Sequence, residues 1–218
     1  EAFSIDLVEK IRCISEATIL NIYGPTETTI CATVKDLSSA KEVTIGSPNP
    51  NYHSYILNKY GQLKPFGIPG ELCIGGVAVA RGYLGKSKLT DEKFVPNPFT
   101  AGEMMYHTGD LVRWLPNGEL EYLGRMDHQV KIRGYRIELR EIESQLREYP
   151  QIKQAIVVDQ VYGNRKLLAA YYVSDNKVSF DEIRKYLSDK LPEFMIPEKM
   201  IQVEEIPLNP NGKVDRKR

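Results

Sequence analysis

Residues 21–29 have the sequence Asn21-Ile22-Tyr23-Gly24-Pro25-Thr26-Glu27-Thr28-Thr29. The apolar residues Ile19, Leu20 and Ile22 predict the end of a buried strand, after which Gly-Pro reverses the backbone and brings the polar side chains out together. Three side chains suited to a nucleotide lie close together here. The Tyr23 ring can stack on a base, the Thr26 hydroxyl can bond a phosphate oxygen, and the Glu27 carboxylate can bind magnesium. The stretch therefore predicts a nucleotide pocket, and an ordinary strand-to-turn junction with a solvated Glu27 is the alternative.

The composition is that of an ordinary globular protein. The chain has 218 residues, of which 42% are hydrophobic and 27% are charged, enough for one large or two modest domains. Lys and Arg total 29, as do Asp and Glu, so the formal net charge is zero. No overall field therefore attracts nucleic acid or anionic lipid, and neither is expected as a partner.

The cysteines and the apolar runs bear on the compartment. Cys13, Cys31 and Cys73 are odd in number and lack Cys-x-x-Cys spacing, which argues against disulfides and a zinc site and favours a reducing, cytoplasmic setting. Each is expected to be a small buried hydrophobic residue. No apolar run approaches the roughly 18 residues of a membrane helix. The chain begins with Glu1 rather than Met, and we expect it to be part of something longer.

The pattern along the chain predicts an α+β fold in two parts. Apolar spacing at Phe3, Leu7, Val8 and Ile11 predicts a helix within residues 1–20, and the segment from Val43 to Tyr122 is mostly β. Strands are expected at residues 52–57, 71–75, 111–115, 120–123, 154–160 and 166–173. Helices are expected at residues 138–149 and 179–191, the second capped by Ser179. The pattern changes from mostly β to mixed between Gly118 and Gln129.

Five blocks, in order, carry a resemblance to a known family. They are Asn21 to Glu27; Gly70-Glu71-Leu72-Cys73-Ile74-Gly75-Gly76 with Ala80-Arg81-Gly82-Tyr83-Leu84; Tyr106-His107-Thr108-Gly109-Asp110-Leu111; Gly124 to Leu139; and Ile206 to Arg216. Together they resemble the core motifs of the amino-acid adenylation domains of non-ribosomal peptide synthetases, members of the adenylate-forming superfamily. The resemblance implies the β-rich C-terminal part of the large subdomain at residues 1–126 and a small mobile α+β subdomain at residues 127–218, with a hinge near Asp127.

The resemblance also implies a chemistry and a set of roles. The family forms aminoacyl-AMP from an amino acid and ATP with Mg²⁺, then transfers the aminoacyl group to the phosphopantetheine thiol of a peptidyl carrier protein. Nucleotide-binding positions correspond to Asn21, Tyr23, Gly24, Thr26, Asp110 and Arg125, and the magnesium ligand corresponds to Glu27. Asp110 is implied to accept hydrogen bonds from both ribose hydroxyls, and Arg125 to reach the ribose and phosphates.

Two lysines and the hinge belong to the implied second subdomain. Lys213 is implied to bridge the reacting carboxylate and phosphate, where negative charge develops. After rotation about Asp127, the face that carries Lys131 and Gly134 is implied to meet the large subdomain for thiol transfer. From the residues alone, residues 130–133 predict a strand with one apolar and one basic face, and a plainly solvated basic face is the alternative.

The amino-acid pocket is implied to include Ile22, Ile30 and Cys31, all apolar here. An unpaired charge against them would cost several kcal/mol, so an apolar or aromatic amino acid is favoured. Plain core residues are the alternative.

The departures from the family pattern define the alternatives. No segment matches the family's Gly/Ser/Thr-rich phosphate loop or the Asp that binds the substrate amino group, so we expect the missing N-terminal half to be a partner and the chain alone to be inactive. Ala78 and Arg140 stand where the family often has glycine, and His107 where Arg or Lys is usual. A stand-alone enzyme like the D-alanine:carrier-protein ligase, and a non-catalytic carrier-docking module, remain as alternatives.

Overall fold

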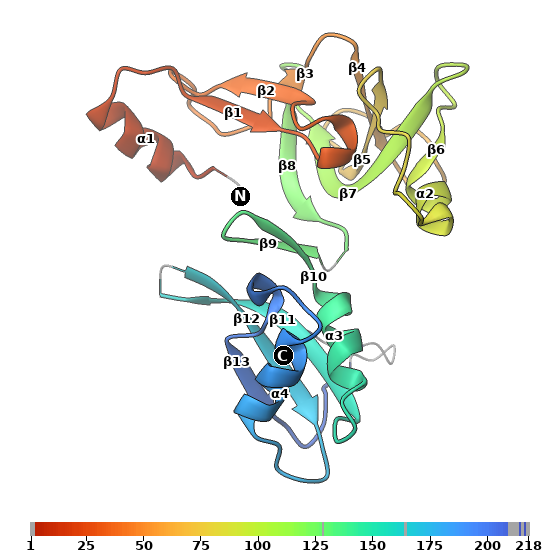
Figure 1. Ribbon diagram of the computed structural model, residues 1–218. Coiled ribbons are helices and arrows are strands. Elements are labelled where there is room, and N and C mark those ends of the chain that lie inside the picture. Colours follow the sequence, from red (N-terminus) through yellow and green to blue (C-terminus); the bar gives the residue numbers. More distant parts are fainter. Residues whose placement is uncertain (1–2, 128, 164, 209–213, 215, 217–218) are drawn as a thin grey trace. The chain divides into compact units, whose positions relative to one another are not determined.

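The chain folds as a mixture of helices and strands in two compact units. The computed structural model describes residues 3–127, 129–163, 165–208, 214 and 216, which form four α-helices and 13 strands (Figure 1). The predicted α+β fold class is confirmed. Residues 2–127 pack into one unit and residues 128–218 into another. They are called the N-terminal and C-terminal units below.

The first helix leads into a small antiparallel sheet. Helix α1 (Ile5–Ile14) begins after Ser4, whose hydroxyl accepts a hydrogen bond from the Leu7 amide. Val8 is fully buried against Ile19 and Leu37. Strand β1 (Leu20–Tyr23) then pairs antiparallel with β2 (Thr33–Asp36), which pairs with β3 (Ser47–Pro48).

The burial of β1 differs from the sequence prediction. Leu20 and Ile22 are 49% and 53% exposed, whereas the polar neighbours Asn21 and Tyr23 are buried. Because side chains alternate across a strand, only one of the two sets can face the core. The polar side chains can be buried because their polar groups are hydrogen-bonded. The Asn21 amide donates to the Thr44 carbonyl at 2.6 Å, and the Tyr23 hydroxyl has a partner that is described below.

A five-stranded antiparallel sheet dominates the N-terminal unit. Its strands β4 (Tyr52–Leu57), β5 (Gly70–Gly76), β7 (Met104–Trp114) and β6 (Phe94–Pro96) are neighbours in that order, and β8 (Leu120–Arg125) also pairs with β7. The expected strands at residues 52–57, 71–75 and 120–123 are confirmed. Strand β7 begins much earlier than expected, so the segment around Asp110 lies inside a strand. Helix α2 (Ser87–Lys93) was not predicted.

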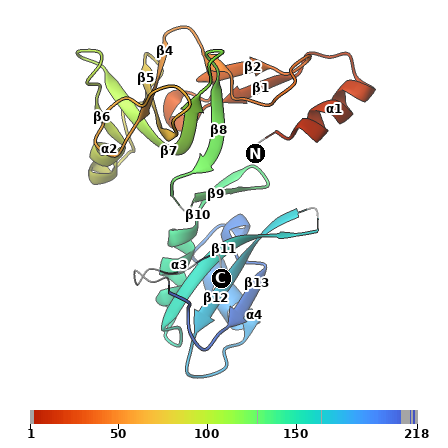
Figure 2. The same cartoon turned by 180° about the vertical axis from the view of Figure 1, so that it is seen from behind.

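The C-terminal unit packs two helices on one face of a three-stranded sheet (Figures 1 and 2). The sheet contains β11 (Gln154–Tyr162), β12 (Arg165–Val173) and β13 (Lys199–Gln202), and the helices are α3 (Leu139–Arg147) and α4 (Phe180–Ser188). Ser179 caps α4 as predicted, in a reciprocal arrangement with Glu182. Leu146, Val157 and Ile183 are fully buried in the shared core.

A separate hairpin precedes α3. Strand β9 (Gln129–Ile132) pairs with β10 (Tyr135–Glu138), and Arg133 and Gly134 form the two-residue turn with φ of 51° and 83°. Two positive φ values in a two-residue loop match the turn that suits the twist of a hairpin. Ile132 is buried and Lys131 exposed, as predicted, but the strand ends at Ile132, so Arg133 lies in the turn and not on a basic face of the strand.

Two expectations about surfaces can be compared with the structure. Cys73 is buried and Cys31 half-buried, but Cys13 is exposed, so the prediction of three buried cysteines is wrong for Cys13. Cys13 occupies the outer side of α1, whose short apolar stripe covers only one face. Among the described helices, none is long and apolar enough to cross a membrane.

Candidate active site

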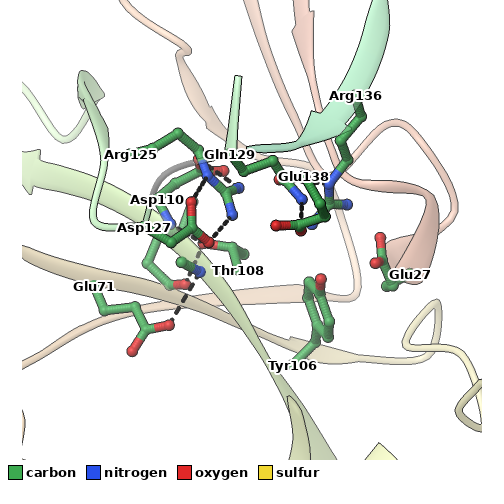
Figure 3. Close-up of polar contacts among 12 residues, drawn as sticks. Glu27, Glu71, Tyr106, Thr108, Asp110, Arg125, Asp127, Gln129, Arg136 and Glu138 are labelled. Atoms are coloured by element: carbon green, nitrogen blue, oxygen red, sulfur yellow. Dashed lines mark hydrogen bonds and ion pairs between the residues drawn. The ribbon is translucent and has the colours of Figure 1, made fainter. Parts of the chain in front are cut away.

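A buried carboxylate lies at the centre of the candidate site in the N-terminal unit (Figure 3). Asp110 in β7 is 6% exposed, and its Oδ2 accepts a hydrogen bond from the Tyr23 hydroxyl at 2.5 Å. Its Oδ1 accepts a hydrogen bond from Arg125 Nη1 at 3.0 Å. Burial and the charge of Asp110 raise the pKa of Tyr23, so the phenol remains a donor. The structure thus brings together residues from β1, β7 and β8.

Arg125 joins this carboxylate to the predicted hinge residue. Its Nε and Nη2 donate to the two oxygens of Asp127 at 2.8 and 2.5 Å, the paired geometry that a guanidinium favours. Burial lowers the pKa of Arg125, but Asp127 and Asp110 more than offset this, so the pKa lies above its usual value. Arg125 therefore stays charged between two carboxylates.

The backbone around Gly109 makes this arrangement possible. Gly109 has φ of 73°, and a Cβ there would lie 2.9 Å from both Arg125 Nη2 and Asp127 Oδ2. Glu71 Oε1 accepts the Gly109 amide at 3.0 Å, and the Thr108 hydroxyl bonds the Leu72 carbonyl and the Asp110 amide at 2.7 and 2.9 Å. Sequence reasoning assigned no role to Glu71 or Thr108, although both lie in the quoted motifs.

The predicted magnesium ligand lies in a second polar group. Glu27, in the short 3₁₀ turn Thr26–Thr28, accepts a hydrogen bond from the Tyr83 hydroxyl at 2.7 Å through Oε1. The Tyr83 hydroxyl is 3.4 Å from that of Tyr106. Burial, together with Tyr106 and Glu27, raises the pKa of Tyr83. Tyr83 and Tyr106 were also missed by sequence reasoning, since tyrosine in a motif does not reveal the partner of its hydroxyl.

The turn after β1 depends on Gly24. A Cβ at Gly24 would lie 2.3 Å from the Ile30 carbonyl oxygen, so no larger residue fits. The Pro25 carbonyl accepts the amides of Thr28 and Ile30 at 3.0 and 3.2 Å, which closes the turn and leaves Thr26 exposed. Asn21, by contrast, is buried, and its amide donates to the Thr44 carbonyl, while its role at a nucleotide stays a prediction.

The predicted pocket residues lie on both sides of this turn. Ile22 and Ile30 are 53% and 68% exposed, and Cys31 accepts a hydrogen bond from Asn49 Nδ2 at 3.1 Å. Thr29 and Ile30 have φ of 59° and 71°, a region that β-branched residues rarely adopt. An uncommon backbone at a candidate site is consistent with a functional constraint.

The C-terminal unit holds the remaining candidates. Lys131 is exposed on β9, whereas Lys213 lies outside the described residues. Leu208 and Val214 pair in an antiparallel bridge. Arg216 donates to the buried Glu143 and to the Val157 carbonyl, both at 2.6 Å.

The motifs extend into the start of the C-terminal unit, where Figure 3 also shows polar contacts of β9 and β10. The Gln129 amide donates a hydrogen bond to the Glu138 carboxylate. Its oxygen accepts one from Arg136 Nε at 2.6 Å. These contacts fix the side chains at the base of the hairpin.

Comparisons with known proteins point to the same family at both ends of the chain. Residues 1–84 match the family model of the AMP-binding enzymes, and residues 141–213 match that of the AMP-binding enzyme C-terminal domain. Surfactin synthase subunit 1 of Bacillus subtilis (strain 168) is 47% identical over 100% of this chain and 6% of the relative. Tyrocidine synthase 1 of Brevibacillus parabrevis is 49% identical over 99% of this chain and 20% of the relative.

A solved structure gives the same result for the fold. The structure of holo-PA1221, a non-ribosomal peptide synthetase protein containing adenylation and PCP domains, matches with a TM-score of 0.84 and 26% identity. The match covers 99% of this chain and 38% of that one. The chain thus spans only part of each protein that it resembles.

Proposed function

The chain belongs to the AMP-binding enzyme family, among the adenylation domains of non-ribosomal peptide synthetases, and from this premise we propose that it takes part in forming aminoacyl-AMP from ATP and an amino acid. In this reaction a carboxylate oxygen of the amino acid attacks the α-phosphorus of ATP and pyrophosphate leaves. The attacking carboxylate and the triphosphate are both negatively charged, so the protein has to orient them and offset their charge.

Asp110 carries the proposal. A carboxylate held by Tyr23 and Arg125 is fixed in direction, and each of its oxygens can accept a further hydrogen bond. We assign it to the two ribose hydroxyls of ATP. Arg125, charged and shared with Asp127, is then placed to face the ribose and phosphate region.

The other assignments rest on the chemistry of the side chains. Glu27 offers the oxygen ligands that Mg²⁺ prefers, and the ion would neutralise phosphate charge. Tyr23 and Thr26 are assigned to adenine and phosphate, and Lys213 to the charge that develops between the reacting groups. Tyr23 is only 9% exposed, so little of its side chain is open to the base.

We further propose that the aminoacyl group passes to the phosphopantetheine thiol of a peptidyl carrier domain. Asp127 ends the N-terminal unit, and its contact with Arg125 connects the proposed hinge to the ATP site. Rotation there would exchange Lys213 for the face that carries Lys131. The exposed Ile22 and Ile30 support an apolar or aromatic substrate.

Amino-acid-dependent exchange of labelled pyrophosphate into ATP tests the first half-reaction. The assay uses the chain within a full adenylation domain, because no segment of the 218-residue chain matches the family's phosphate loop. The 218-residue chain alone is expected to give no exchange. Asp110→Asn should lower kcat/KM for ATP by about ten- to a hundredfold, the effect of losing a hydrogen bond to a charged group.

The matched control is Asp175→Asn, which changes an exposed carboxylate that pairs with Lys153. It should leave exchange unchanged. Unimpaired exchange in Asp110→Asn would remove the ribose assignment, and no exchange by the full domain with any amino acid would contradict the adenylation proposal itself.

A further inference from the structure

Three metal-ligand side chains meet on one face of the sheet in the N-terminal unit. Cys73 in β5 and His107 in β7 are direct cross-strand partners. Glu71 lies two residues before Cys73 and therefore on the same face of β5. The ladder shifts register between Glu71 and Cys73, opposite the segment that contains Gly109, and across this shift the Glu71 carboxylate contacts His107.

The distances suit a tetrahedral metal ion. His107 Nδ1 lies 3.0 Å from Glu71 Oε2 and 3.4 Å from Cys73 Sγ, and all three ligand atoms lie within 4.8 Å of one another. Ligand atoms around tetrahedral zinc are about 3.3 to 3.6 Å apart, given bond lengths of about 2.0 to 2.3 Å. Shifts of a few tenths of an ångström would bring His107 Nδ1 to the required distances from Glu71 and Cys73, whereas the Glu71 and Cys73 ligand atoms, which lie within 4.8 Å of each other, have to approach by up to about 1 Å.

The surroundings provide both a closed and an open side. Cys73 is fully buried among apolar residues that include Leu57 and Met105. The side chains of His107 and Glu71 are 26% and 23% exposed, so an ion can enter past them. Among the described residues, no other trio of His, Cys, Asp or Glu brings its ligand atoms this close.

We propose that Glu71, Cys73 and His107 bind a zinc ion through Oε2, Sγ and Nδ1, with the fourth position open to water. Imidazole, thiolate and carboxylate are all zinc ligands, whereas a thiolate is a poor ligand for Mg²⁺. The site is separate from the magnesium assigned to Glu27. The cysteine spacing argued against a zinc site held by Cys-x-x-Cys, but this site needs a single cysteine, with His107 supplied by a neighbouring strand. Binding would displace two protons, the thiol proton of Cys73 to solvent and the proton that His107 Nδ1 donates to Glu71, which moves to solvent or to Nε2 of the same ring.

The site connects to the proposed ATP site through one residue. Glu71 Oε1 accepts the amide of Gly109, next to Asp110, while Oε2 faces His107. A metal on Oε2 would fix the Glu71 carboxylate and with it the backbone that presents Asp110. Burial and the charge of Glu71 raise the pKa of the Cys73 thiol, and the charge of Lys93 lowers it only in part, so the ion has to displace a tightly held proton.

Cobalt titration of the full adenylation domain tests the proposal independently of activity, because Co²⁺ replaces Zn²⁺ in such sites and absorbs strongly when bound by thiolate. One equivalent of Co²⁺ should produce a thiolate charge-transfer band in the near ultraviolet, and Zn²⁺ should abolish it. Cys73→Ser should remove the band. His107→Arg should weaken binding by at least about tenfold, since even outer-shell changes cost that much.

His107→Arg is informative because arginine can still donate a hydrogen bond to Glu71 and so preserve the fold. His53→Gln and Cys13→Ser are the controls: His53 faces Glu103 at 3.5 Å without a cysteine in the cluster, and Cys13 is exposed on α1. Both should keep the band. A band that persists in Cys73→Ser, or no band in the parent, would overturn the site and leave a hydrogen-bonded His107–Glu71 pair beside a thiol.

Discussion

At the residue scale, removing the Tyr23 hydroxyl tests how strongly its hydrogen bond stabilises the buried Asp110 carboxylate. Tyr23→Phe keeps the ring in the core but removes the donor to Asp110 Oδ2. Hydrogen bonds to charged groups are worth about 1.5 to 3 kcal/mol, so we expect the free energy of unfolding to fall by about 2 kcal/mol. Urea denaturation of the full domain measures it.

Tyr52→Phe is the matched control for that change. The Tyr52 hydroxyl donates at 3.1 Å to the Thr28 carbonyl, a neutral acceptor, so its loss should cost about 1 kcal/mol or less. Equal losses in the two variants would show that the charge of Asp110 does not strengthen its bond to Tyr23.

Ile30 provides a second test at this scale. Its side chain is 68% exposed and its φ is 71°, so it contributes little packing and occupies a strained backbone region. Ile30→Gly should raise the free energy of unfolding by up to about 1 kcal/mol, because the left-handed region costs about 1 to 2 kcal/mol for a residue with Cβ. In the full domain it should also weaken discrimination between apolar amino acids in the exchange assay.

Asn51→Gly is the control, since asparagine tolerates its φ of 66° and gains little from the change. If Ile30→Gly instead lowers stability and leaves amino-acid preference unchanged, then the Ile30 side chain contributes to packing and does not contact the amino-acid substrate.

At the element scale, the sequence predicted most elements but not their contacts. Turn residues and apolar alternation located the strand at residues 52–57 to the residue, and Ser179 located the start of α4. The prediction of which β1 side chains are buried was wrong, because Asn21 and Tyr23 form hydrogen bonds with residues far away in the sequence, and no local pattern reveals such partners. The contact between Glu71 and Gly109 likewise depends on a register shift that only strand pairing creates.

The link between β2 and the turn before β8 should be visible in the pH dependence of stability. Glu119 accepts hydrogen bonds from Lys35 and, at 2.8 Å, from Thr44. Burial raises the pKa of Glu119, but Lys35 and Thr44 more than offset this and the pKa lies below its usual value. Its contribution is therefore present above the unfolded pKa and is lost as pH falls through the lower folded pKa.

Glu119→Gln should thus cost about 2 kcal/mol near pH 7 and progressively less as pH falls below the usual pKa of glutamate and through the lower folded pKa, where the parent carboxylate becomes protonated. Thermal unfolding across this range measures the difference. Glu148→Gln is the control, because its pair with Lys190 is exposed and worth little. A pH-independent difference would mean that the Glu119 charge does not hold the two elements together.

At the scale of the whole molecule, the proposed chemistry needs Lys213, and the structure describes what holds the chain beyond it. Arg216, three residues later, donates at 2.6 Å to Glu143, which is 4% exposed, and to the Val157 carbonyl. Glu143 also accepts the Val157 amide at 2.9 Å. Arg216 is thereby attached to α3 and β11 of the C-terminal unit.

Arg216→Met leaves a buried carboxylate without its cation, and the expected loss of stability is about 3 to 5 kcal/mol. Glu143→Gln/Arg216→Met removes both charges, and its cost should be clearly smaller because no uncompensated charge stays buried. Both variants, however, release the segment that follows Lys213. If attachment of that segment matters for catalysis, exchange activity stays low in the double variant although its stability recovers. Recovery of both together would mean that Arg216 supports the fold alone, and the position of Lys213 would then depend on other contacts.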